Sequence, residues 1–487
     1  MTPATWDGQL IFERSRPGRS GASLPALDVP PIDARARYGA LARKRSAGLP
    51  EVSEPEVVRH YINLSHANYA IDRAMVPLGS CSMKYNPKVN EWAARLDGFA
   101  LAHPLASAEA TQGALEVMYR LERALAEICG MDEVSLHPAA GAQGELTALK
   151  MIRAAHQAQG RSPKRVLIPE SAHGTNAASC VLNGFEIVPF RAGERGIVEP
   201  EALAPLLGDD VAALMLTNPN TLGLFESHLP TLAELVHGCG GFVFGDGANL
   251  NALLGKTRPG DLGIDIMQFN LHKTFTTPHG GGGPGCGPVA FKSRLAAFAP
   301  VPVVAQDAAG HFFLDAHRPQ SVGRLRGFAG NFAMMVRAYA YIRELGAEGL
   351  RGVAEAAVLN ANYLRVLLEA CWHQPFPRAC MHEVVLSDKY LKETGCSTLD
   401  IAKGLIDYGF HPPTVYFPLV VKGALLIEPT ETESRETLER FAAVLNALAD
   451  EASSAPQKLK DAPHQAPLRR LDETRAARQP KLRASLG

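Results

Sequence analysis

The chain has 487 residues, of which 46% are hydrophobic and 20% charged, and its formal net charge is −1. This length exceeds one average core and predicts at least two domains, while the balanced charge excludes a global field that would recruit nucleic acid or an acidic membrane surface. The eight cysteines form no CxxC pair and have no histidine at zinc-finger spacing, so we expect neither a disulfide framework nor a metal site.

The first 60 residues are rich in Pro, Gly and Arg, as in residues 15–21 (SRPGRSG). This composition predicts an irregular arm, which is either disordered or wrapped around a partner subunit. The first residues lack the basic start and apolar run of a signal peptide, and no uncharged apolar stretch approaches the roughly 20 residues of a membrane span. We therefore expect a soluble, cytoplasmic protein. Residues 1–95 are expected to form an N-terminal arm and the segment that follows it.

From about residue 111 an alternation of helices and strands is predicted. Apolar residues recur at helical spacing from Leu115 to Ile128, and Gly130 follows as a C-terminal cap. Short apolar runs at 165–169, 186–190, 212–217, 241–245 and 266–269 are typical of buried strands. Strands of this kind, separated by segments long enough for crossover helices, favour an α/β fold with a mostly parallel sheet covered on both faces. We assign residues 96–334 to this large domain.

Residues 335–453 are predicted to form a smaller C-terminal α+β domain. It contains apolar runs at 383–386 and 424–427 and ends in an amphipathic helix with Leu438, Phe441, Leu445 and Leu448 on one face. Residues 454–487 carry eight Lys or Arg residues against three acids. They are expected to form a basic tail, which is either solvated or a docking surface.

Lys273 is the first residue that suggests chemistry. It directly follows a predicted buried strand and precedes the glycine run at 280–283. A buried lysine with a lowered pKa is a good amine nucleophile and can form an imine with an aldehyde. Taken alone, the position fits better a lysine that merely reaches the surface at the end of the strand.

Asp246 strengthens this interpretation, because it ends the preceding predicted strand in the segment 245–249 (GDGAN). Pyridoxal phosphate needs a carboxylate beside its pyridine nitrogen, since a protonated ring accepts electrons from a carbanion. Adjacent parallel strands would bring Asp246 and Lys273 to opposite ends of one ring. The other reading of Asp246 is a helix cap.

Three further loops follow predicted strands and would therefore share one edge of the sheet. Small residues at 139–142, before a helix predicted from Leu146 to Ala155, favour an anion cup for a phosphate, or else a tight turn. His173 could lie flat on a cofactor ring, and the turn at Asn218 could border it. The chain thus offers, in this order, a loop for an anion, a residue that could cover the ring, a carboxylate and an amine. This order along the chain resembles that of the fold-type I pyridoxal-phosphate enzymes.

Longer segments carry a closer resemblance. They are residues 77–87 (PLGSCSMKYNP), 272–274 with the glycine run, 411–418 (HPPTVYFP), 427–434 (IEPTETES) and the opening 10–13 with 16–19. Across residues 10–475, approximately, the chain resembles glycine dehydrogenase (aminomethyl-transferring), the P-protein family of the glycine cleavage system. This family occurs as one long chain of two homologous halves or as two subunits, and only the second subunit carries the cofactor lysine. With 487 residues and Lys273, the chain resembles subunit 2.

The resemblance implies a pyridoxal 5'-phosphate enzyme that decarboxylates glycine and transfers the aminomethyl group to the lipoyl arm of H-protein. It further implies subunit 1 as a partner, with two copies of each subunit. By the same resemblance, Lys273 is the catalytic, cofactor-bound lysine, Asp246 pairs with the ring nitrogen, and His173 stacks on the ring. The remaining residues expected to border the cofactor are Ala140, Gly141, Ala142, Ala248, Asn218 and His272.

Residues for the substrate are less distinct. Ser80, Ser82 and Lys84 occupy a polar, sharply turned loop, and Arg324 and Arg326 could bind the glycine carboxylate or the phosphate, or form salt bridges. His66 and His279 are candidate proton shuttles or ordinary structural histidines.

Two alternatives remain open at this point. One is another fold-type I enzyme, such as a cysteine desulfurase or an amino-acid decarboxylase. Such an enzyme would share Lys273 and Asp246 but should lack the segments 77–87 and 411–418. The other alternative is a non-catalytic subunit that keeps the fold and binds a partner, against which the intact lysine, aspartate and histidine set argues.

Overall fold

The structure is a computed structural model that describes residues 8–45, 47–279 and 285–482. The chain divides into two units: residues 71–462 form one, and the described residues of 1–70 and 463–487 form the other. Within the described residues, no helix combines the length and the apolar character that crossing a membrane requires.

The N-terminal segment is mostly irregular, as its composition predicts, but α2 (Glu54–His66) begins inside the stretch expected to be irregular. The reason is local, because Ser53 and Glu56 form a reciprocal capping box and Pro55 stands in the first turn. Shorter helices of this unit are α1 (Ala34–Tyr38) and α15 (Glu473–Arg478).

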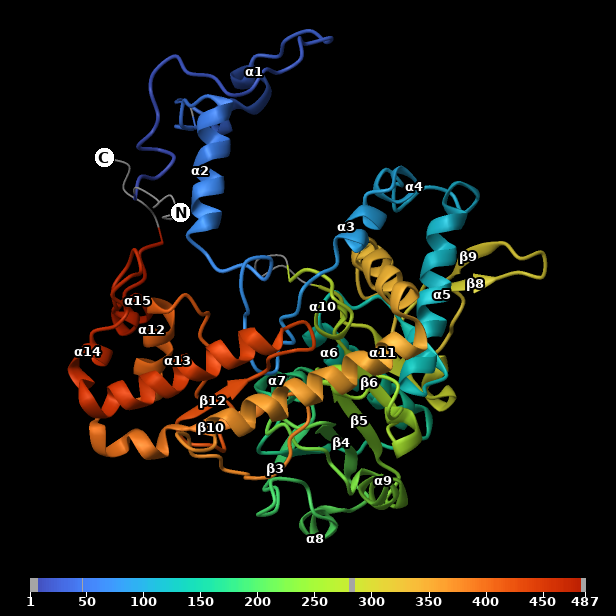
Figure 1. The fold of residues 1–487 in the computed structure, drawn as a ribbon. Helices are drawn as coiled ribbons and strands as arrows, with labels where there is room; N and C mark the ends of the chain where they lie inside the picture. Colours follow the sequence, from blue (N-terminus) through green and yellow to red (C-terminus); the bar gives the residue numbers. More distant parts are fainter. Residues whose placement is uncertain (1–7, 46, 280–284, 483–487) are drawn as a thin grey trace. The chain divides into compact units, whose positions relative to one another are not determined.

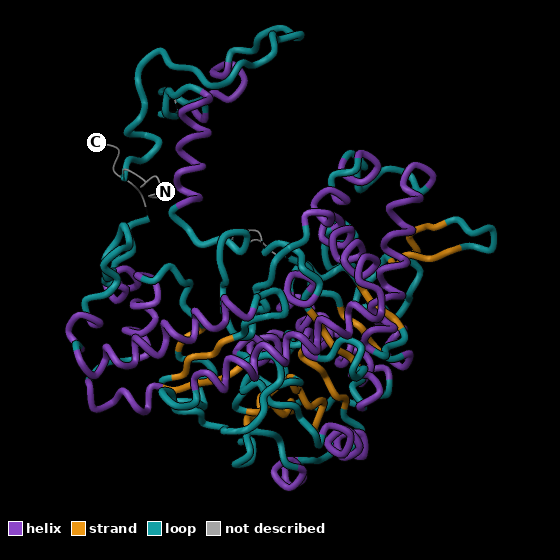
Figure 2. The backbone as a smooth tube through the Cα atoms, in the orientation of Figure 1, coloured by secondary structure: helices purple, strands orange, loops and turns teal. Residues whose placement is uncertain are grey.

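A seven-stranded sheet forms the centre of the unit of residues 71–462, in the order β1-β7-β6-β5-β4-β2-β3. Figure 1 labels β3, β4, β5 and β6 of this sheet, and Figure 2 draws all strands in orange. The five strands from β6 to β3 are parallel, while β7 is antiparallel to both of its neighbours. The strands are β1 (Glu133–Ser135), β2 (Arg165–Pro169), β3 (Glu186–Phe190), β4 (Val211–Thr217), β5 (Phe242–Gly247), β6 (Ile266–Phe269) and β7 (Val289–Phe291). The predicted mostly parallel sheet is thus confirmed.

Helices cover both faces of this sheet. Along β4, Leu214 and Leu216 join one hydrophobic cluster with α5 and α9, whereas Ala213 and Met215 join another with α6 and α7. Alternate residues of a strand point to opposite faces, so a strand buried on both sides reads as a continuous apolar run. The covering helices are α5 (Gln112–Cys129), α6 (Gly141–Ala158), α7 (Gly174–Leu182) and α9 (Leu229–Gly238).

Two helix boundaries bear on the predictions. The helix α5 ends at the left-handed Gly130, as expected. The helix α6 begins at Gly141 and not at Leu146, so the small residues expected to form a loop make its first turn. Amphipathic periodicity detects a helix only where apolar residues recur, and this first turn is built of small residues.

A second sheet, which is antiparallel and has the order β10-β12-β11, lies in the C-terminal part of the chain. It packs with α12, α13 and the last part of α11 in a separate hydrophobic cluster. The helical segment α11, which is interrupted by a kink at the non-helical Gly346, spans the expected domain boundary (Figure 1). Met335 and Ala338 belong to the core of the large sheet, and Leu364 and Leu368 belong to this cluster. The elements are α11 (Phe332–Leu368), β10 (Val384–Ser387), α12 (Thr398–Asp407), β11 (Thr414–Val415), β12 (Ala424–Ile427), α13 (Arg435–Ser454) and α14 (Pro456–Lys460).

Short elements connect these parts. They are α3 (Lys88–Ala94), α4 (Asp97–Ala100), α8 (Pro200–Leu203), α10 (Leu271–Thr274) and the hairpin of β8 (Val303–Gln306) and β9 (Phe312–Asp315). Further 3-10 turns lie at Gly39–Leu41, Glu109–Thr111, Ala204–Leu206, Leu250–Ala252, Pro259–Leu262, Ser293–Phe298 and Asp388–Thr394.

Gly79 brings the loop of residues 77–85 into direct contact with β12. Its backbone N–H donates to the carbonyl of Leu426 at 3.2 Å, and a Cβ at this position would overlap Leu426 Cγ and lie 2.7 Å from the Leu426 carbonyl oxygen. We expect Gly79→Ala to lower the free energy of unfolding by about 1–3 kcal/mol, as overpacking does. Urea denaturation measures this, with Gly352→Ala as control.

Gly352 lies inside α11, and a Cβ there would meet no atom within 4 Å. Its replacement should stabilise the helix by up to about 1 kcal/mol. Equal effects of the two substitutions would show that the close approach at Gly79 is not required.

Candidate active site

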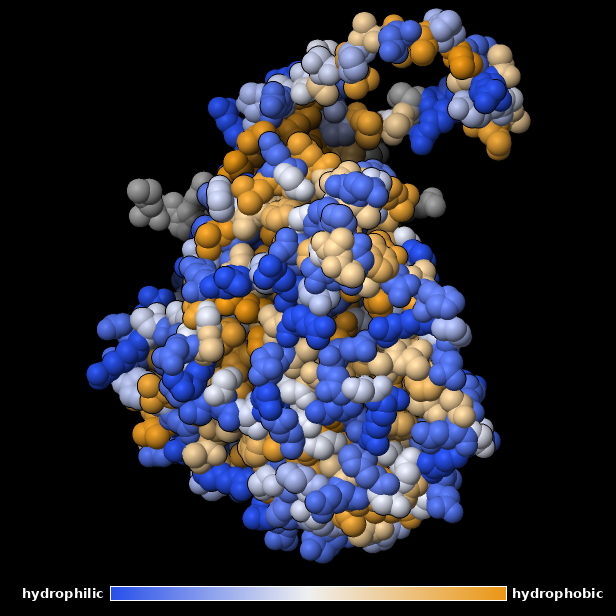
Figure 3. Space-filling view, turned by 90° about the vertical axis from the view of Figure 1, so that its right-hand side faces the viewer, coloured by the Kyte–Doolittle hydropathy of each residue, from blue (hydrophilic) through white to orange (hydrophobic). Residues whose placement is uncertain are grey.

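Several cavities lie in the unit of residues 71–462, and two of them differ sharply in character. One, of about 360 Å³, is lined mainly by apolar residues of α5, β9 and the adjoining segments, among them Leu115, Phe313 and Phe328. Figure 3 shows the side of the molecule that carries these elements, where apolar and hydrophilic side chains are mixed. The other cavity, of about 220 Å³, shares none of these residues and is lined largely by polar ones. The second cavity is therefore the candidate active site.

The polar cavity lies where the parallel strands end. Thr217 is the last residue of β4, Asp246 is the last but one of β5, and Gln268 lies near the end of β6. The cavity is lined by Ser80, Gly141, Ala142, Glu145, His173, Thr175, Thr217, Thr221, Asp246, Ala248, Gln268, Asn270, His272 and Lys273. Ligands of open α/β sheets bind at this edge, because the loops after the strands converge there.

Lys273 lies on the single turn of α10, directly after β6 and Asn270. Its side chain is half-buried, and Nζ donates a hydrogen bond to the carbonyl oxygen of Ser80 at 2.7 Å. Among the ionisable lining residues, it is the amine that faces the cavity. Among the described residues, the carbonyl oxygen of Ser80 thus holds this primary amine at the cavity wall.

Asp246 is buried, with 4% of its surface exposed. Its Oδ1 accepts hydrogen bonds from Gln268 Nε2 at 2.5 Å and from the backbone N–H of Ala248 at 3.0 Å, and its Oδ2 accepts from Asn176 Nδ2 at 3.3 Å. Three donors on an acceptor-only group fix the plane of the carboxylate. Ala248 contributes here through its backbone.

The start of α6 forms one wall. Gly141 and Ala142 line the cavity with the first turn of the helix, and Ala140 precedes them as the N-cap residue. A Cβ at Gly141 would overlap Asn270 Nδ2, so a larger residue here would require the buried Asn270 side chain to shift. The N-terminus of an α-helix carries free N–H groups and a partial positive charge, which suits an anion.

His173 is the N-cap of α7, and its Nδ1 accepts from the backbone N–H of Thr175 at 3.2 Å. The ring is exposed and lies edge-on to Phe417 with the ring centroids 5.9 Å apart. Phe417 belongs to the segment 411–418, so this motif reaches the rim of the cavity from the C-terminal part of the chain.

Asn218 and His272, two other residues expected to border the cofactor, lie at different places relative to the cavity. Asn218 is buried beside the cavity, where its Oδ1 accepts from the backbone N–H of Glu226 at 3.0 Å, while its neighbours Thr217 and Thr221 line the wall. His272 lines the cavity, with its ring 5.0 Å from that of His279. Burial, with the neighbouring His279 and Lys273, lowers the pKa of His272 to about 4. The glycine run 280–283 lies outside the described residues.

Two buried glutamates, Glu383 and Glu428, accept hydrogen bonds from the backbone of the loop that contains Ser80 and Ser82. The backbone N–H of Ser80 donates to Glu383 Oε2 at 2.7 Å, and that of Ser82 donates to Glu428 Oε2 at 2.8 Å. Both serines have positive φ, which non-glycine residues adopt only when the surroundings enforce it. Burial, together with the charge of Glu428, raises the pKa of Glu383 well above its usual range. Of the two serines, Ser80 reaches the cavity.

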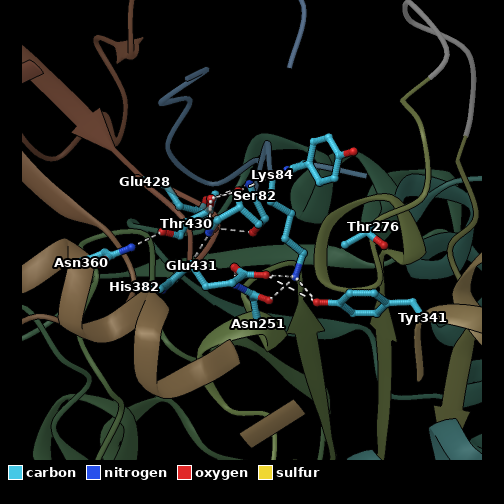
Figure 4. A network of polar contacts seen from close by, with 12 residues as sticks. Ser82, Lys84, Asn251, Thr276, Tyr341, Asn360, His382, Glu428, Thr430 and Glu431 are labelled. Atoms are coloured by element: carbon cyan, nitrogen blue, oxygen red, sulfur yellow. Dashed lines mark hydrogen bonds and ion pairs between the residues drawn. The ribbon is translucent and has the colours of Figure 1, made fainter. Parts of the chain in front are cut away.

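Lys84 has a different surrounding from the one expected of a substrate residue. It is 3% exposed, and its Nζ lies 2.7 Å from Glu431 Oε1, 2.8 Å from Asn251 Oδ1 and 3.3 Å from the Tyr341 hydroxyl (Figure 4). These groups satisfy all three protons of an ammonium group. The geometry therefore makes Lys84 an anchor of the loop behind the cavity.

The remaining candidates for substrate binding or proton transfer, Arg324, Arg326 and His66, do not line the polar cavity. Arg326 donates to Asn331 Oδ1 at 2.8 Å, Arg324 is exposed, and neither is among the residues that line the polar cavity. His66 lies at the end of α2, in the other unit.

Several lining residues escaped sequence analysis, namely Glu145, Thr175, Thr217, Thr221, Gln268 and Asn270. Gln268 carried a detectable signal, since an amide inside the otherwise apolar strand 266–269 is unexpected. Glu145 carried no such signal, because it lies in the small-residue start of α6, which shows no amphipathic periodicity.

Comparisons with solved structures agree on the fold. The inhibitor-bound glycine decarboxylase (P-protein) of the glycine cleavage system matches with a TM-score of 0.73 and 23% identity, covering 85% of this chain and 94% of that chain. A sphingosine-1-phosphate lyase from Burkholderia pseudomallei matches with a TM-score of 0.63, 14% identity and coverage of 87% and 96%. A mutant of C-DES with glycine covalently linked to its PLP cofactor matches with a TM-score of 0.60 and 16% identity, covering 77% of this chain and 97% of that chain. The chain thus has the fold of the fold-type I pyridoxal-phosphate enzymes.

Sequence comparisons narrow the class. The family model of the glycine cleavage system P-protein matches residues 40–403, and that of the glycine dehydrogenase C-terminal domain matches 353–470. A probable glycine dehydrogenase (decarboxylating) subunit 2 from Oceanobacillus iheyensis is 53% identical over 476 residues, which are 97% of this chain and 98% of that protein. The protein of the same description from Desulforamulus reducens is 54% identical over 475 residues, with 97% and 98% covered.

The chain therefore belongs to the family of glycine dehydrogenase (decarboxylating) subunit 2, the P-protein of the glycine cleavage system. The expected family, enzyme class and role in glycine decarboxylation are confirmed at this level.

Proposed function

We propose that the polar cavity holds pyridoxal phosphate, with its aldehyde carbon at Lys273, its ring nitrogen at Asp246 and its phosphate at the start of α6. Polar atoms of the cavity support this fit. Thr217 Oγ1, Gln268 Oε1 and Asn270 Oδ1 are buried and have no hydrogen-bond partner among the described residues. Buried polar groups are normally paired, so these atoms indicate a polar ligand or water in the cavity. In this proposal, His173 at the rim covers one face of the ring.

When bound, this cofactor supplies an electron sink for the carbanion left by loss of carbon dioxide. The protein supplies the rest. Asp246, with its plane set by Gln268, Asn176 and Ala248, keeps a proton on the ring nitrogen. The Nζ of Lys273, held at the Ser80 carbonyl, would be the amine that binds the aldehyde carbon of the cofactor and binds it again after turnover. His272 is a neutral imidazole at neutral pH, because its pKa is lowered to about 4.

The proposed substrates and partners follow from the family. Glycine is the amino-acid substrate, and the lipoyl arm of H-protein is the acceptor of the aminomethyl group. The description of the relatives as subunit 2 supports a partner subunit 1, and we propose two copies of each. The single observation that carries the function is the lysine–aspartate pair across one polar cavity, in a chain of this family.

Glycine-dependent exchange of labelled bicarbonate tests the function. We expect exchange when the chain is combined with subunit 1 and lipoylated H-protein, and little or none when either is omitted. Serine, alanine and cysteine, at matched concentrations, serve as controls for the substrate. Exchange by the chain without subunit 1 would contradict the half-enzyme assignment, and equal rates with alanine would contradict glycine as the substrate.

A further inference from the structure

A second carboxyl group lies beside Asp246 in the cavity. Glu145 is the fifth residue of α6, lines the cavity and is 4% exposed. Its Oε2 accepts a hydrogen bond from Asn176 Nδ2 at 2.9 Å, and the same Nδ2 lies 3.3 Å from Asp246 Oδ2. One side-chain amide on α7 therefore bridges the two carboxyl groups.

The surroundings of Glu145 determine its charge. The charged or titratable groups that face it are Asp246 from β5, Lys273 from α10 and Cys180 from α7, and Ser179 Oγ lies 3.5 Å from its Oε2. Burial raises the pKa of Glu145 to about 8, and the charge of Asp246 acts in the same direction. The hydrogen bonds from Asn176 and Ser179 and the charge of Lys273 oppose this shift without cancelling it. At neutral pH Glu145 is therefore mostly protonated.

Two carboxylates sharing one buried site repel each other, so that one of them keeps a proton. Asp246 accepts from three donors, which is the arrangement of an ionised acceptor. We propose that Glu145 is a positioning residue that, as a neutral carboxylic acid, holds Asn176 and through it orients Asp246, so that one negative charge faces the cofactor ring. This inference deepens the proposed function and rests on it, since it takes Asp246 as the partner of the ring nitrogen.

The protonation of Glu145 can be tested on the cofactor-free protein. Infrared spectra at about pH 6.5 and about pH 9.5 should show the carbonyl stretch of a protonated carboxyl that is lost at the higher pH and is missing in Glu145→Gln. Glu433→Gln is the matched control, because burial also raises the pKa of Glu433 and its side chain does not line the cavity. It should leave the Glu145 signal in place. No difference between the wild type and Glu145→Gln at about pH 6.5 would overturn the inference.

The same proton links stability to pH. The folded-state pKa of about 8 lies above the ordinary 4.5, so the folded protein holds a proton that the unfolded chain releases. The stability from this proton is fully present below about pH 4.5 and is lost as the pH rises toward about 8. Glu145→Gln should therefore flatten the decline in urea midpoint over this window, and an unchanged decline would contradict the inference.

The positioning role is tested by the affinity for pyridoxal phosphate and by the visible spectrum of the bound cofactor. Glu145→Gln keeps a carbonyl acceptor for Asn176, so its dissociation constant should stay within about threefold of the wild type, whereas Glu145→Leu should bind about tenfold more weakly. The spectrum of the bound cofactor should also depend on pH differently in the wild type and in Glu145→Gln, because only the wild type can ionise at this position.

The outcomes separate the two proposals. Equal affinities of the wild type and Glu145→Leu would overturn the positioning role while leaving the cofactor assignment intact. A wild type that binds no pyridoxal phosphate would overturn the proposed function, and the infrared result would still decide the protonation of Glu145.

Discussion

Lys273→Ala should abolish glycine-dependent exchange of bicarbonate, with a loss of about a thousandfold or more. The amine would be the group that binds the cofactor covalently and binds it again after turnover, and covalent catalysis of this kind contributes orders of magnitude. The variant should also lack the visible absorbance that appears when pyridoxal phosphate is added to the wild type. Exchange assays and absorbance titrations of the purified variant measure both effects.

Lys292→Ala is the matched control for this experiment. Lys292 also donates through Nζ to a single backbone carbonyl, that of Gly130 at 2.5 Å, but it is not among the residues that line the polar cavity. Removing it costs a comparable hydrogen bond and should leave the absorbance in place. If Lys273→Ala still gains the wild-type absorbance, or if both variants lose activity alike, Lys273 is not the cofactor lysine.

The part of the site that follows the strands could be predicted from sequence because the geometry of a parallel sheet is regular. Asp246 ends one buried strand and Lys273 follows the next, and adjacent parallel strands end at the same edge. The same rule places His173 and the residues at Asn218 near that edge. Continuous apolar runs are local properties, which is why β2 to β6 were also predictable, whereas the three-residue strand β7 was too short to give such a run.

Contacts between distant segments could not be predicted in this way. Lys84 meets Glu431 across 347 positions of the sequence, and no local pattern indicates which buried acid would neutralise a lysine. A polar residue in a sharply turned loop therefore suggested substrate binding, although its surroundings are those of an internal ion pair. Glu145 was missed for a related reason, since its helix begins in small residues whose role as a helical turn has no periodic signal.

Lys84→Met should lower the free energy of unfolding by about 3–5 kcal/mol, because it leaves the carboxylate of Glu431 buried without its counter-charge. The ion pair is deeply enclosed, with side-chain exposures of 1% for Lys84 and 8% for Glu431. Burial opposes the charge on Lys84, but Glu431 and Tyr341 outweigh it and raise the pKa of the lysine. Urea denaturation of the wild type and the variant, at equal cofactor concentration, measures the loss.

Lys88→Met provides a control in the same segment of the chain. Lys88 pairs with Asp72 at 2.5 Å, but the two side chains are 58% and 50% exposed. An exposed pair of this kind contributes about 0–1 kcal/mol, since water and salt screen it. A loss of similar size in the two variants would contradict the distinction between the buried and the exposed pair.

The double variant Lys84→Met with Glu431→Gln separates two contributions to the loss of stability. One is the lost attraction between Lys84 and Glu431, and the other is the cost of leaving the Glu431 carboxylate buried and unpaired. Glutamine keeps an acceptor beside Asn251 Nδ2, which lies 3.1 Å from Glu431 Oε2, and carries no charge to strand. If the buried charge causes most of the loss, the double variant should recover stability relative to Lys84→Met, and the double-mutant cycle should give a coupling of about 1–3 kcal/mol. Because Lys84 anchors the loop whose Ser80 carbonyl holds Lys273, cofactor affinity should fall in Lys84→Met and recover in part with stability. Full stability recovery without any recovery of affinity would mean that the lysine also acts on the site directly.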